Sequence, residues 1–310
     1  MNRNPLKDPA LAYALADARE RLMPADPSIT SVGIGFGVKG GVETGEVCLQ
    51  VGVEEKRPPE AVESALLLPR AIRAPAAEVR VDVVPTGVLQ RLDAVDLRAR
   101  VRPAAPGYSI GHVACTAGTL GAVLTDKRRR RYILSNNHVL ANENAAATGD
   151  AILQPGPADG GDAKTGVIAR LHAFVPLVTD GANFVDCALA AAERDNELAA
   201  QVHAIGTVIG TGAPYLGLTV RKSGRTTGFT TGRIRRVAVT ARIHYGCGIL
   251  VFSGLAETNQ MSAPGDSGSL IVDQSNRAVG LLFAGSIFST LMCPIEAVRD
   301  ALDLGDMTWF

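Results

Sequence analysis

The stretch Met261–Leu270 reads MSAPGDSGSL and holds Ser267 between two glycines, in Gly265-Asp266-Ser267-Gly268. A segment so short and glycine-rich is, by itself, typical of a solvent-exposed turn. A serine hydroxyl is a weak nucleophile near neutral pH, so it needs a base within hydrogen-bond reach and a carboxylate that orients that base. Whether Ser267 can react therefore depends on histidines and acids elsewhere in the chain.

His138 is the histidine with the most suitable surroundings. The stretch YILSNNHVLA, residues 132–141, places it at the end of an apolar strand, in a polar turn from which its side chain can project into a cleft. The other histidines lack that setting: His112, His172, His203 and His244. We therefore expect His138 to be the base.

Asp186 is the carboxylate expected beside that base. It stands among apolar residues in NFVDCALA, just before a strand-like run. A carboxylate in such a place is costly to desolvate unless it is paired, and the Nδ1 proton of a histidine would supply a partner. A capping or turn role is the alternative for Asp186. Asp180, in the more exposed setting LVTDGAN, is the next candidate.

The overall composition narrows the possible partners and cofactors. The chain has 310 residues, with 46% hydrophobic and 20% charged residues, as in ordinary globular proteins of two or three compact units. Its 31 basic and 31 acidic residues balance, which predicts no nucleic-acid or membrane partner. Histidines and cysteines never gather at ligand spacing, so we expect no metal.

The chain shows no sign of a bound cofactor or an export route. Residues 35–40 fit G-x-G-x-x-G as letters, but Gly41 and another turn follow where a dinucleotide site needs a helix, so a glycine-rich hairpin is expected. No apolar run reaches the roughly 20 residues that cross a bilayer, and the first 22 residues lack a signal peptide's apolar centre, which predicts a cytoplasmic protein. The five cysteines form no C-x-x-C pair and are expected to be reduced.

The distribution of strand and turn signals predicts a small α+β unit followed by an all-β unit. DPALAYALADARERLM suggests an amphipathic helix, and ITSVGIGFGV, EVCLQVGVEE and EVRVDVVPTG suggest strands around a short helix in PPEAVESALLL. RARVRPAAPGYSIG has the composition of a linker. From Ser109 onward short apolar strands follow one another without alternating helices, including GTVIG at 206–210, and PIEAVRDAL suggests one closing helix. This pattern favours a barrel or sandwich.

Three stretches together carry a family resemblance. LSNNHVL, VDCALA and APGDSGSLIV, in this order, resemble the trypsin-like serine peptidases of the chymotrypsin fold, in which two six-stranded β-barrels meet at a cleft holding the triad. VRKSGRTTGFTTGRI, at 220–234, is similar to a hairpin of the bacterial members, and AVGLLFAGS, at 278–286, to their substrate-binding strand. ITSVGIGFGVKGGVETGEV and the region from GTLGAV to GDAILQPGPADGG resemble, more narrowly, a bacterial branch related to the plant NARROW LEAF 1 proteins, which carry an extra N-terminal region and in some cases form oligomers.

The resemblance implies a mainly β fold, a trypsin-like double six-stranded β-barrel preceded by a small α+β N-terminal domain. The expected boundaries are an N-terminal helix at 1–27, the small domain at 28–90, a linker at 91–108, a first barrel with His138 and Asp186 at 109–195, and a second barrel with Ser267 and a C-terminal helix at 196–310. The small domain would be either an inhibitory prosegment or, as we favour, a domain for oligomerisation or partner binding.

The resemblance also assigns roles to residues. Ser267 would be the nucleophile, His138 the general base and then acid, and Asp186 the orienting carboxylate. The backbone N–H groups of Gly265 and Ser267 would form the oxyanion hole. Met261 would lie at the base of the primary pocket, with Ala284 and Gly285 on its wall, which favours a small or medium apolar substrate side chain.

These roles predict a serine endopeptidase that cleaves protein or peptide substrates through an acyl-enzyme. An acyl hydrolase or esterase with the same triad is one alternative, and a weakly active scaffold for homo-oligomers or partners is the other. In zymogens of the family the aspartate before the nucleophile pairs with a new N-terminus, but no such cleavage site precedes the first barrel here. Asp266 must therefore be held by other contacts or controlled by the N-terminal domain.

Overall fold

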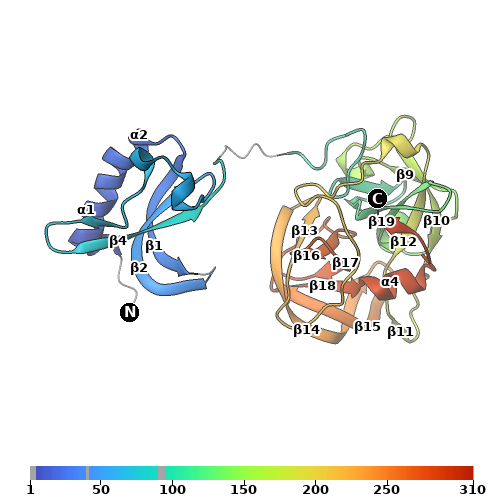
Figure 1. The fold of residues 1–310 in the computed structure, drawn as a ribbon. Coiled ribbons are helices and arrows are strands. Elements are labelled where there is room, and N and C mark those ends of the chain that lie inside the picture. Colours follow the sequence, from blue (N-terminus) through green and yellow to red (C-terminus); the bar gives the residue numbers. More distant parts are fainter. Residues whose placement is uncertain (1–4, 40–41, 90–94, 310) are drawn as a thin grey trace. The chain divides into compact units, whose positions relative to one another are not determined.

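The computed structural model describes residues 5–39, 42–89 and 95–309, which divide into two compact units, Met1–Ala94 and Val95–Phe310. The expected hairpin turn at Gly40 and the first expected linker residues, 91–94, lie outside the described residues. Figure 1 shows that one helical segment and one curved sheet make up the first unit, and that strands dominate the second.

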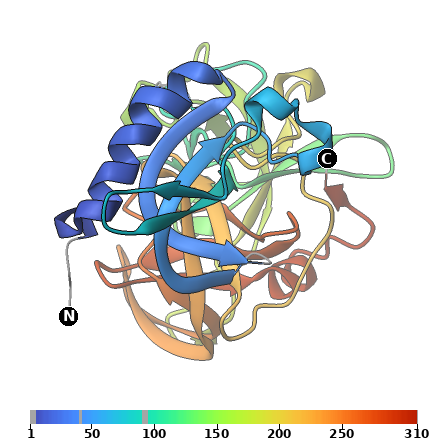
Figure 2. The same ribbon diagram turned by 60° about the vertical axis from the view of Figure 1, so that its left-hand side comes forward.

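The N-terminal unit is a four-stranded sheet with a helical segment packed along it (Figures 1 and 2). The strand order is β1-β2-β4-β3, with β1 (Ile29–Lys39), β2 (Val42–Val53), β3 (Ala71–Arg73) and β4 (Glu78–Pro85). The helical segment consists of α1 (Pro9–Asp17), a π-helical turn (Ala18–Leu22) and α2 (Met23–Ala25). Asp8 caps α1, because its carboxylate accepts the N–H of Ala10 at 2.9 Å. Ala14, Leu15 and Leu22 then bury one helix face against Leu49 and Val51 of β2.

The helix expected in PPEAVESALLL is replaced by two 3-10 turns, Pro59–Ala61 and Ser64–Leu66. Val62 and Glu63 between them have extended backbone angles, so no helical hydrogen bonds continue across them. Proline lacks an N–H donor and the segment is short, so a longer helix gains little here.

The first sheet of the second unit has eight strands in the order β19-β7-β8-β12-β10-β9-β5-β6. Their bounds are β5 (Ser109–His112), β6 (Gly118–Thr119), β7 (Ala122–Thr125), β8 (Arg131–Ser135), β9 (Ala151–Leu153), β10 (Val167–Phe174), β12 (Ala188–Ala192) and β19 (Thr308–Trp309). A short helix, α3 (Asn137–Leu140), follows β8.

The second sheet has seven strands in the order β11-β15-β14-β13-β16-β17-β18. Their bounds are β11 (Ala182–Asn183), β13 (Thr219–Gly224), β14 (Gly228–Tyr245), β15 (Gly248–Asn259), β16 (Leu270–Asp273), β17 (Ala278–Gly285) and β18 (Ser289–Pro294). An additional pairing between β15 and β18 closes six of these strands, β13 to β18, into a ring. The closing helix expected near the end is present as α4 (Ile295–Ala301).

Strand alternation divides the apolar side chains of this unit between the barrel interiors and the contact between the sheets. On β8, Ile133 belongs to one buried cluster, whereas Tyr132 and Leu134 belong to a second cluster that also contains Leu270 of β16. Because neighbouring side chains on a strand point to opposite faces, one strand can serve both clusters. The sheets are therefore joined by a shared apolar layer.

The fold class expected from the sequence, mainly β with a double barrel after a small α+β domain, is confirmed. The stretch GTVIG, at 206–210, was expected to be a strand but forms none. Its first residue, Gly206, makes an isolated bridge with Val202, and Thr211 after it makes one with Ala278. None of the helices in the described ranges is both long enough and apolar enough to span a membrane.

Candidate active site

His138 and Asp186 come together because their strands pair. His138 lies in α3, directly after β8, and Asp186 precedes β12; β8 and β12 pair antiparallel with Ser135 opposite Ala188. His138 Nδ1 and Asp186 Oδ2 are 2.5 Å apart. The Asp186 side chain is fully buried, whereas that of His138 is 23% exposed. The pair therefore presents the imidazole, and not the carboxylate, to solvent.

The Asp186 carboxylate is satisfied from several sides. Its Oδ1 accepts the backbone N–H of Asn137 at 2.6 Å and that of His138 at 3.3 Å, while its Oδ2 also accepts the hydroxyl of Tyr245 at 2.5 Å. Burial by itself would raise the pKa of Asp186, but the charge and hydrogen bonds of His138, with the Tyr245 hydroxyl, hold that pKa below its ordinary value. Asp186 therefore stays ionised.

The ionised carboxylate in turn affects the pKa of the His138 imidazole and the position of its ring proton. Burial acts to lower the pKa of His138, but the charge and hydrogen bond of Asp186, together with the charge of Glu143, raise that pKa above its ordinary value. The short Nδ1 contact also fixes Nδ1 as the protonated nitrogen, which leaves Nε2 free to accept a proton.

Ser267 lies in the turn that connects β15 to β16, and its hydroxyl is bonded to a backbone carbonyl. Ser267 Oγ donates to the carbonyl of Phe283 at 3.4 Å. Within the described part of the chain no hydrogen bond joins Ser267 to His138. Of the two hydrogen bonds that a triad requires, the structure thus contains the one between His138 and Asp186.

A type II turn presents the backbone N–H of Gly265. The Asp266 N–H donates to the Ala263 carbonyl at 3.0 Å, Pro264 occupies the second position, and Gly265 has φ +97° at the third. A Cβ on Gly265 would lie 2.5 Å from Thr226 Oγ1, so only glycine fits.

The orientation of the amide before Gly265 is fixed by a hydroxyl. The Pro264 carbonyl accepts the Thr226 hydroxyl at 2.8 Å, and in a trans peptide the next N–H must point the opposite way. The N–H groups of Gly265 and Ser267 donate to no other group in the described residues. Both N–H groups are therefore without an acceptor in this part of the structure.

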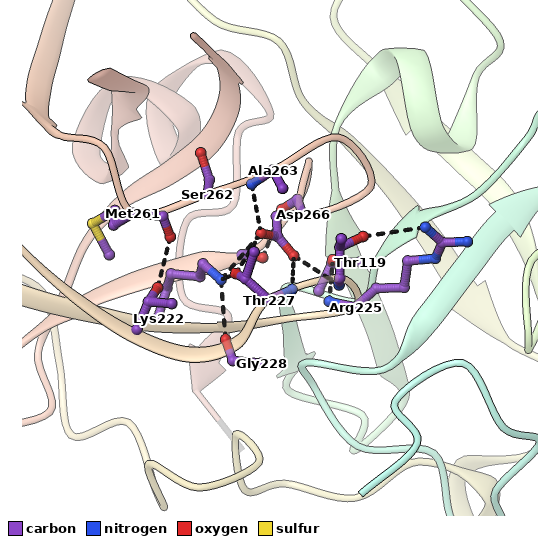
Figure 3. A network of polar contacts seen from close by, with 12 residues as sticks. Thr119, Lys222, Arg225, Thr227, Gly228, Met261, Ser262, Ala263 and Asp266 are labelled. Atoms are coloured by element: carbon purple, nitrogen blue, oxygen red, sulfur yellow. Dashed lines mark hydrogen bonds and ion pairs between the residues drawn. The ribbon is translucent and has the colours of Figure 1, made fainter. Parts of the chain in front are cut away.

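Asp266, beside the serine, is held by a buried lysine (Figure 3). Asp266 and Lys222 are both 0% exposed, with Lys222 Nζ 3.2 Å from Asp266 Oδ2. The same carboxylate accepts the Thr227 hydroxyl at 2.6 Å and the N–H groups of Ala263 and Thr226 at 3.0 and 2.8 Å. Burial would raise the pKa of Asp266, but Lys222 and these donors hold it below the ordinary value. Asp266 is therefore held by contacts within its own barrel, in place of the new N-terminus that pairs with this aspartate in zymogens of the resembled family.

Lys222 was missed by sequence reasoning, although the chain carries a signal for it. In β13, Val220 and Lys222 are two residues apart and share one face, and Val220 lies in the core of the second barrel. A lysine on the buried face of a strand needs a carboxylate partner.

A cavity of about 320 Å³ opens beside Ser267. Ala284 and Gly285 line it as expected, but Met261 does not. Met261 is 3% exposed and packs into the barrel core, where a Cβ on Gly232 would lie 2.5 Å from its sulfur. Ser262, the next residue, lines the cavity instead, because successive side chains on extended chain point to opposite faces. None of the described residues that line this cavity carries a charged side chain.

A second cavity, of about 520 Å³, lies beside His138. It is bounded by the β14–β15 hairpin and shares Ala284, Gly285 and Ser286 with the cavity beside Ser267. The end of β17 thus borders both cavities, one at the histidine and one at the serine.

The described residues contain no group of three or more histidine, cysteine, aspartate or glutamate side chains that could hold a metal ion. All five cysteines are free thiols.

Comparison with known proteins places the chain near serine proteases. No protein-family model matches it. It is 43% identical over 79 residues to Serine protease 2 of Streptomyces fradiae, a match that covers 26% of this chain and 43% of the relative, so it spans less than half of that relative's length.

Solved structures of lower sequence identity are also similar. They include Thermobifida fusca protease A, with 18% identity, a TM-score of 0.47 and coverage of 64% of this chain and 95% of that one. The alpha-lytic protease homologue N4 has 22% identity, a TM-score of 0.48 and coverage of 66% and 100%. The curated relative is thus named as a serine protease, and these two solved structures are named as proteases.

Proposed function

We propose that the chain is a serine endopeptidase in which Ser267 is the nucleophile, His138 the general base and acid, and Asp186 the residue that orients His138. The observation that carries this proposal is the 2.5 Å contact between His138 Nδ1 and a fully buried Asp186. The cavity beside His138 shares Ala284, Gly285 and Ser286 with the cavity beside Ser267. The curated relative, named as a serine protease, supports the same class of reaction.

The first chemical step requires a rotation of the serine side chain. Ser267 Oγ leaves the Phe283 carbonyl, whose 3.4 Å contact is long, and donates to Nε2 of His138. In enzymes without substrate such hydrogen bonds are often loose and tighten only on binding. His138 then takes the hydroxyl proton while Oγ attacks the substrate carbonyl.

The intermediate that follows carries its charge on the former carbonyl oxygen. The N–H groups of Gly265 and Ser267 are the donors proposed for that oxyanion, with the Gly265 amide held by the bond between Thr226 and Pro264. Protonated His138 gives its proton to the leaving amine, which leaves an acyl group on Ser267. A water molecule, deprotonated by His138, then releases the acid and restores the serine.

The cavity beside Ser267 supports a preference for an apolar side chain before the cleaved bond. At about 320 Å³, and lined by Ala284, Gly285 and Leu282 without a charged group, it fits a small or medium apolar side chain. The hydroxyl of Ser262, which lines the cavity, is bonded to the buried hydroxyl of Thr290 at 2.7 Å, which reduces its need for a polar substrate group.

The alternatives remain an esterase with the same triad and a weakly active scaffold. Kinship with the NARROW LEAF 1 branch, the expected domain boundaries, a cytoplasmic location and assembly into homo-oligomers also stay predictions. Hydrolysis of an internal amide bond in a peptide, compared with a matched ester, separates an endopeptidase from an esterase.

Labelling with a fluorophosphonate tests the proposal most directly. We expect the wild-type chain to be labelled, whereas Ser267→Ala and His138→Ala remain unlabelled because the nucleophile or its base is lost. Ser275→Ala, at an exposed serine, serves as the matched control and should be labelled like the wild type. Folded wild-type protein that stays unlabelled beside an active control protease would contradict the proposal.

A further inference from the structure

Tyr245 reaches the candidate triad from the other barrel. It is the last residue of β14, at the tip of the long β14–β15 hairpin, and its hydroxyl donates to Asp186 Oδ2 at 2.5 Å. The same oxygen receives His138 Nδ1 at 2.5 Å. Two donors on different barrels therefore share one carboxylate oxygen.

The tyrosine ring is held by stacking and edge contacts. Its plane lies 19° from that of Phe252, with ring centroids 5.7 Å apart, and it meets the His138 ring edge-on at 5.9 Å and 82°. Phe252 in turn packs against Phe283, the residue whose carbonyl accepts the Ser267 hydroxyl. The Tyr245 ring is thus packed between the His138 ring and Phe252, which contacts Phe283 of β17.

The hairpin tip is also fixed by the segment that follows the histidine. Glu143, shortly after α3, accepts the N–H groups of Gly246 and Cys247 at 3.2 and 3.3 Å. These contacts join the tip of the β14–β15 hairpin to the turn that follows α3, the helix that carries His138. The position of Tyr245 is therefore fixed both by the β14–β15 hairpin and by the turn after α3.

We propose that Tyr245 is a positioning residue of the active site, which holds the Asp186 carboxylate in plane and limits how strongly it attracts the proton of His138. This inference rests on the proposed function. The positive end of the Tyr245 O–H dipole lies at the oxygen that the imidazolium would share, so it opposes protonation of His138. Burial and the charge of Asp186 raise the pKa of Tyr245, so the phenol keeps its proton and stays a donor.

Other ionisable groups also face the His138 and Tyr245 rings. They come from the Asp186 segment, the Glu143 loop, the β14–β15 hairpin and β18, and comprise Asp186, Glu143, Arg236, Arg242, His244, Glu257 and Cys293. Among them Glu143 acts on His138 in the direction opposite to that proposed for the Tyr245 hydroxyl, because its negative charge raises the pKa of His138. Removing the Tyr245 hydroxyl and removing the Glu143 charge should therefore shift the pKa of His138 in opposite directions.

The test is an NMR titration of the His138 ring, identified by the resonances that His138→Ala lacks. In Tyr245→Phe, which removes the hydroxyl and keeps the ring, we expect the His138 midpoint to move to higher pH. In Glu143→Gln, which keeps an acceptor for the hairpin tip, we expect it to move to lower pH. Tyr215→Phe, at an exposed tyrosine, should leave it unchanged.

A Tyr245→Phe midpoint equal to that of the wild type, or shifted to lower pH, would overturn the inference. The titration requires no turnover, so it is separate from the proposed function: failure to label the wild type would count against the peptidase and not against Tyr245. If the wild type is labelled by the fluorophosphonate, the rate constant of labelling can also be compared between the two proteins. Measured at a pH above the His138 midpoint, that rate constant should be about tenfold lower in Tyr245→Phe than in the wild type, as for loss of one hydrogen bond to a charged group. Labelling as fast as in the wild type would again contradict the proposal.

Discussion

Two fully buried carboxylates, Asp186 and Asp266, flank the candidate nucleophile, and their basic partners differ in exposure. His138, the partner of Asp186, is 23% exposed and borders a cavity of about 520 Å³. Lys222, the partner of Asp266, is 0% exposed and donates further to the Gly228 carbonyl at 3.0 Å. The first pair is therefore accessible from a cavity through its histidine, whereas the second is sealed from solvent and holds the backbone around Ser267.

The two pairs show that a buried carboxylate with a basic partner can serve two different purposes. A buried carboxylate with a basic side chain and several N–H donors stays ionised in both places, and the pKa of each lies below its ordinary value. Where the partner can titrate and meets the cleft, the pair is suited to catalysis. Where the partner is a lysine out of contact with solvent, the pair is suited to holding the turn that presents the N–H groups of Gly265 and Ser267.

The largest effect is expected from Asp186→Asn. The amide cannot accept the His138 Nδ1 proton in the same way, so the imidazole is free to adopt the tautomer that cannot serve as a base. We expect labelling and peptide hydrolysis to fall by about 10⁴-fold, the loss typical of such a change in a serine triad. Asp180→Asn, at the exposed alternative, is the control and should retain wild-type rates. Equal losses in the two variants would remove the special role of Asp186.

A stability effect is expected from Lys222→Met. The change leaves Asp266 buried without its cation, which typically costs about 3–5 kcal/mol of unfolding free energy. Urea unfolding should show this loss, and Lys164→Met, at an exposed lysine, should show almost none. The double variant Lys222→Met/Asp266→Asn should recover much of it, because no unpaired charge remains. A single variant as stable as the Lys164 control would show that the sealed pair does not hold the turn.

Strand positions could be predicted from the sequence because alternation and turn residues are local signals. His138 and Asp186 stood out for the same reason, since a polar residue next to an apolar strand is visible in the letters. Met261 lies in the barrel core and its neighbour Ser262 at the cavity, because a one-residue shift along extended chain moves a side chain to the opposite face. Only the paired structure shows which face meets the cavity.

Tyr245 could not be found from the sequence for a different reason. Its hydroxyl reaches Asp186 only through the length and bending of the β14–β15 hairpin, which contains three register shifts, at Ile234/Arg236, Arg236/Val239 and Val239/Ala241. Such irregularities redirect the strand and depend on contacts far apart in the chain. Lys222 lies between these cases, because its place on an apolar face was readable but its partner was not.

The pH dependence offers the smallest effect and the finest test of the comparison between the two carboxylates. His138 must be neutral to act as a base, and its pKa is above the ordinary value of about 6.5. The rate of labelling should therefore fall as the pH drops through that raised pKa, while the protein stays folded.

The stability profile follows from the same pKa directions. A group with a raised pKa in the folded state, such as His138, contributes stability that is present below its unfolded pKa and is lost as the pH rises through the folded one. Asp266, with a lowered pKa, contributes stability that is present above about pH 4 and is lost as the pH falls through its folded pKa. Labelling rates and urea unfolding should be measured on the same samples across pH. As the pH falls, the labelling rate should drop at a higher pH than the one at which the stabilisation by Asp266 is lost. Loss of both at one pH would mean that the two carboxylates are not independent.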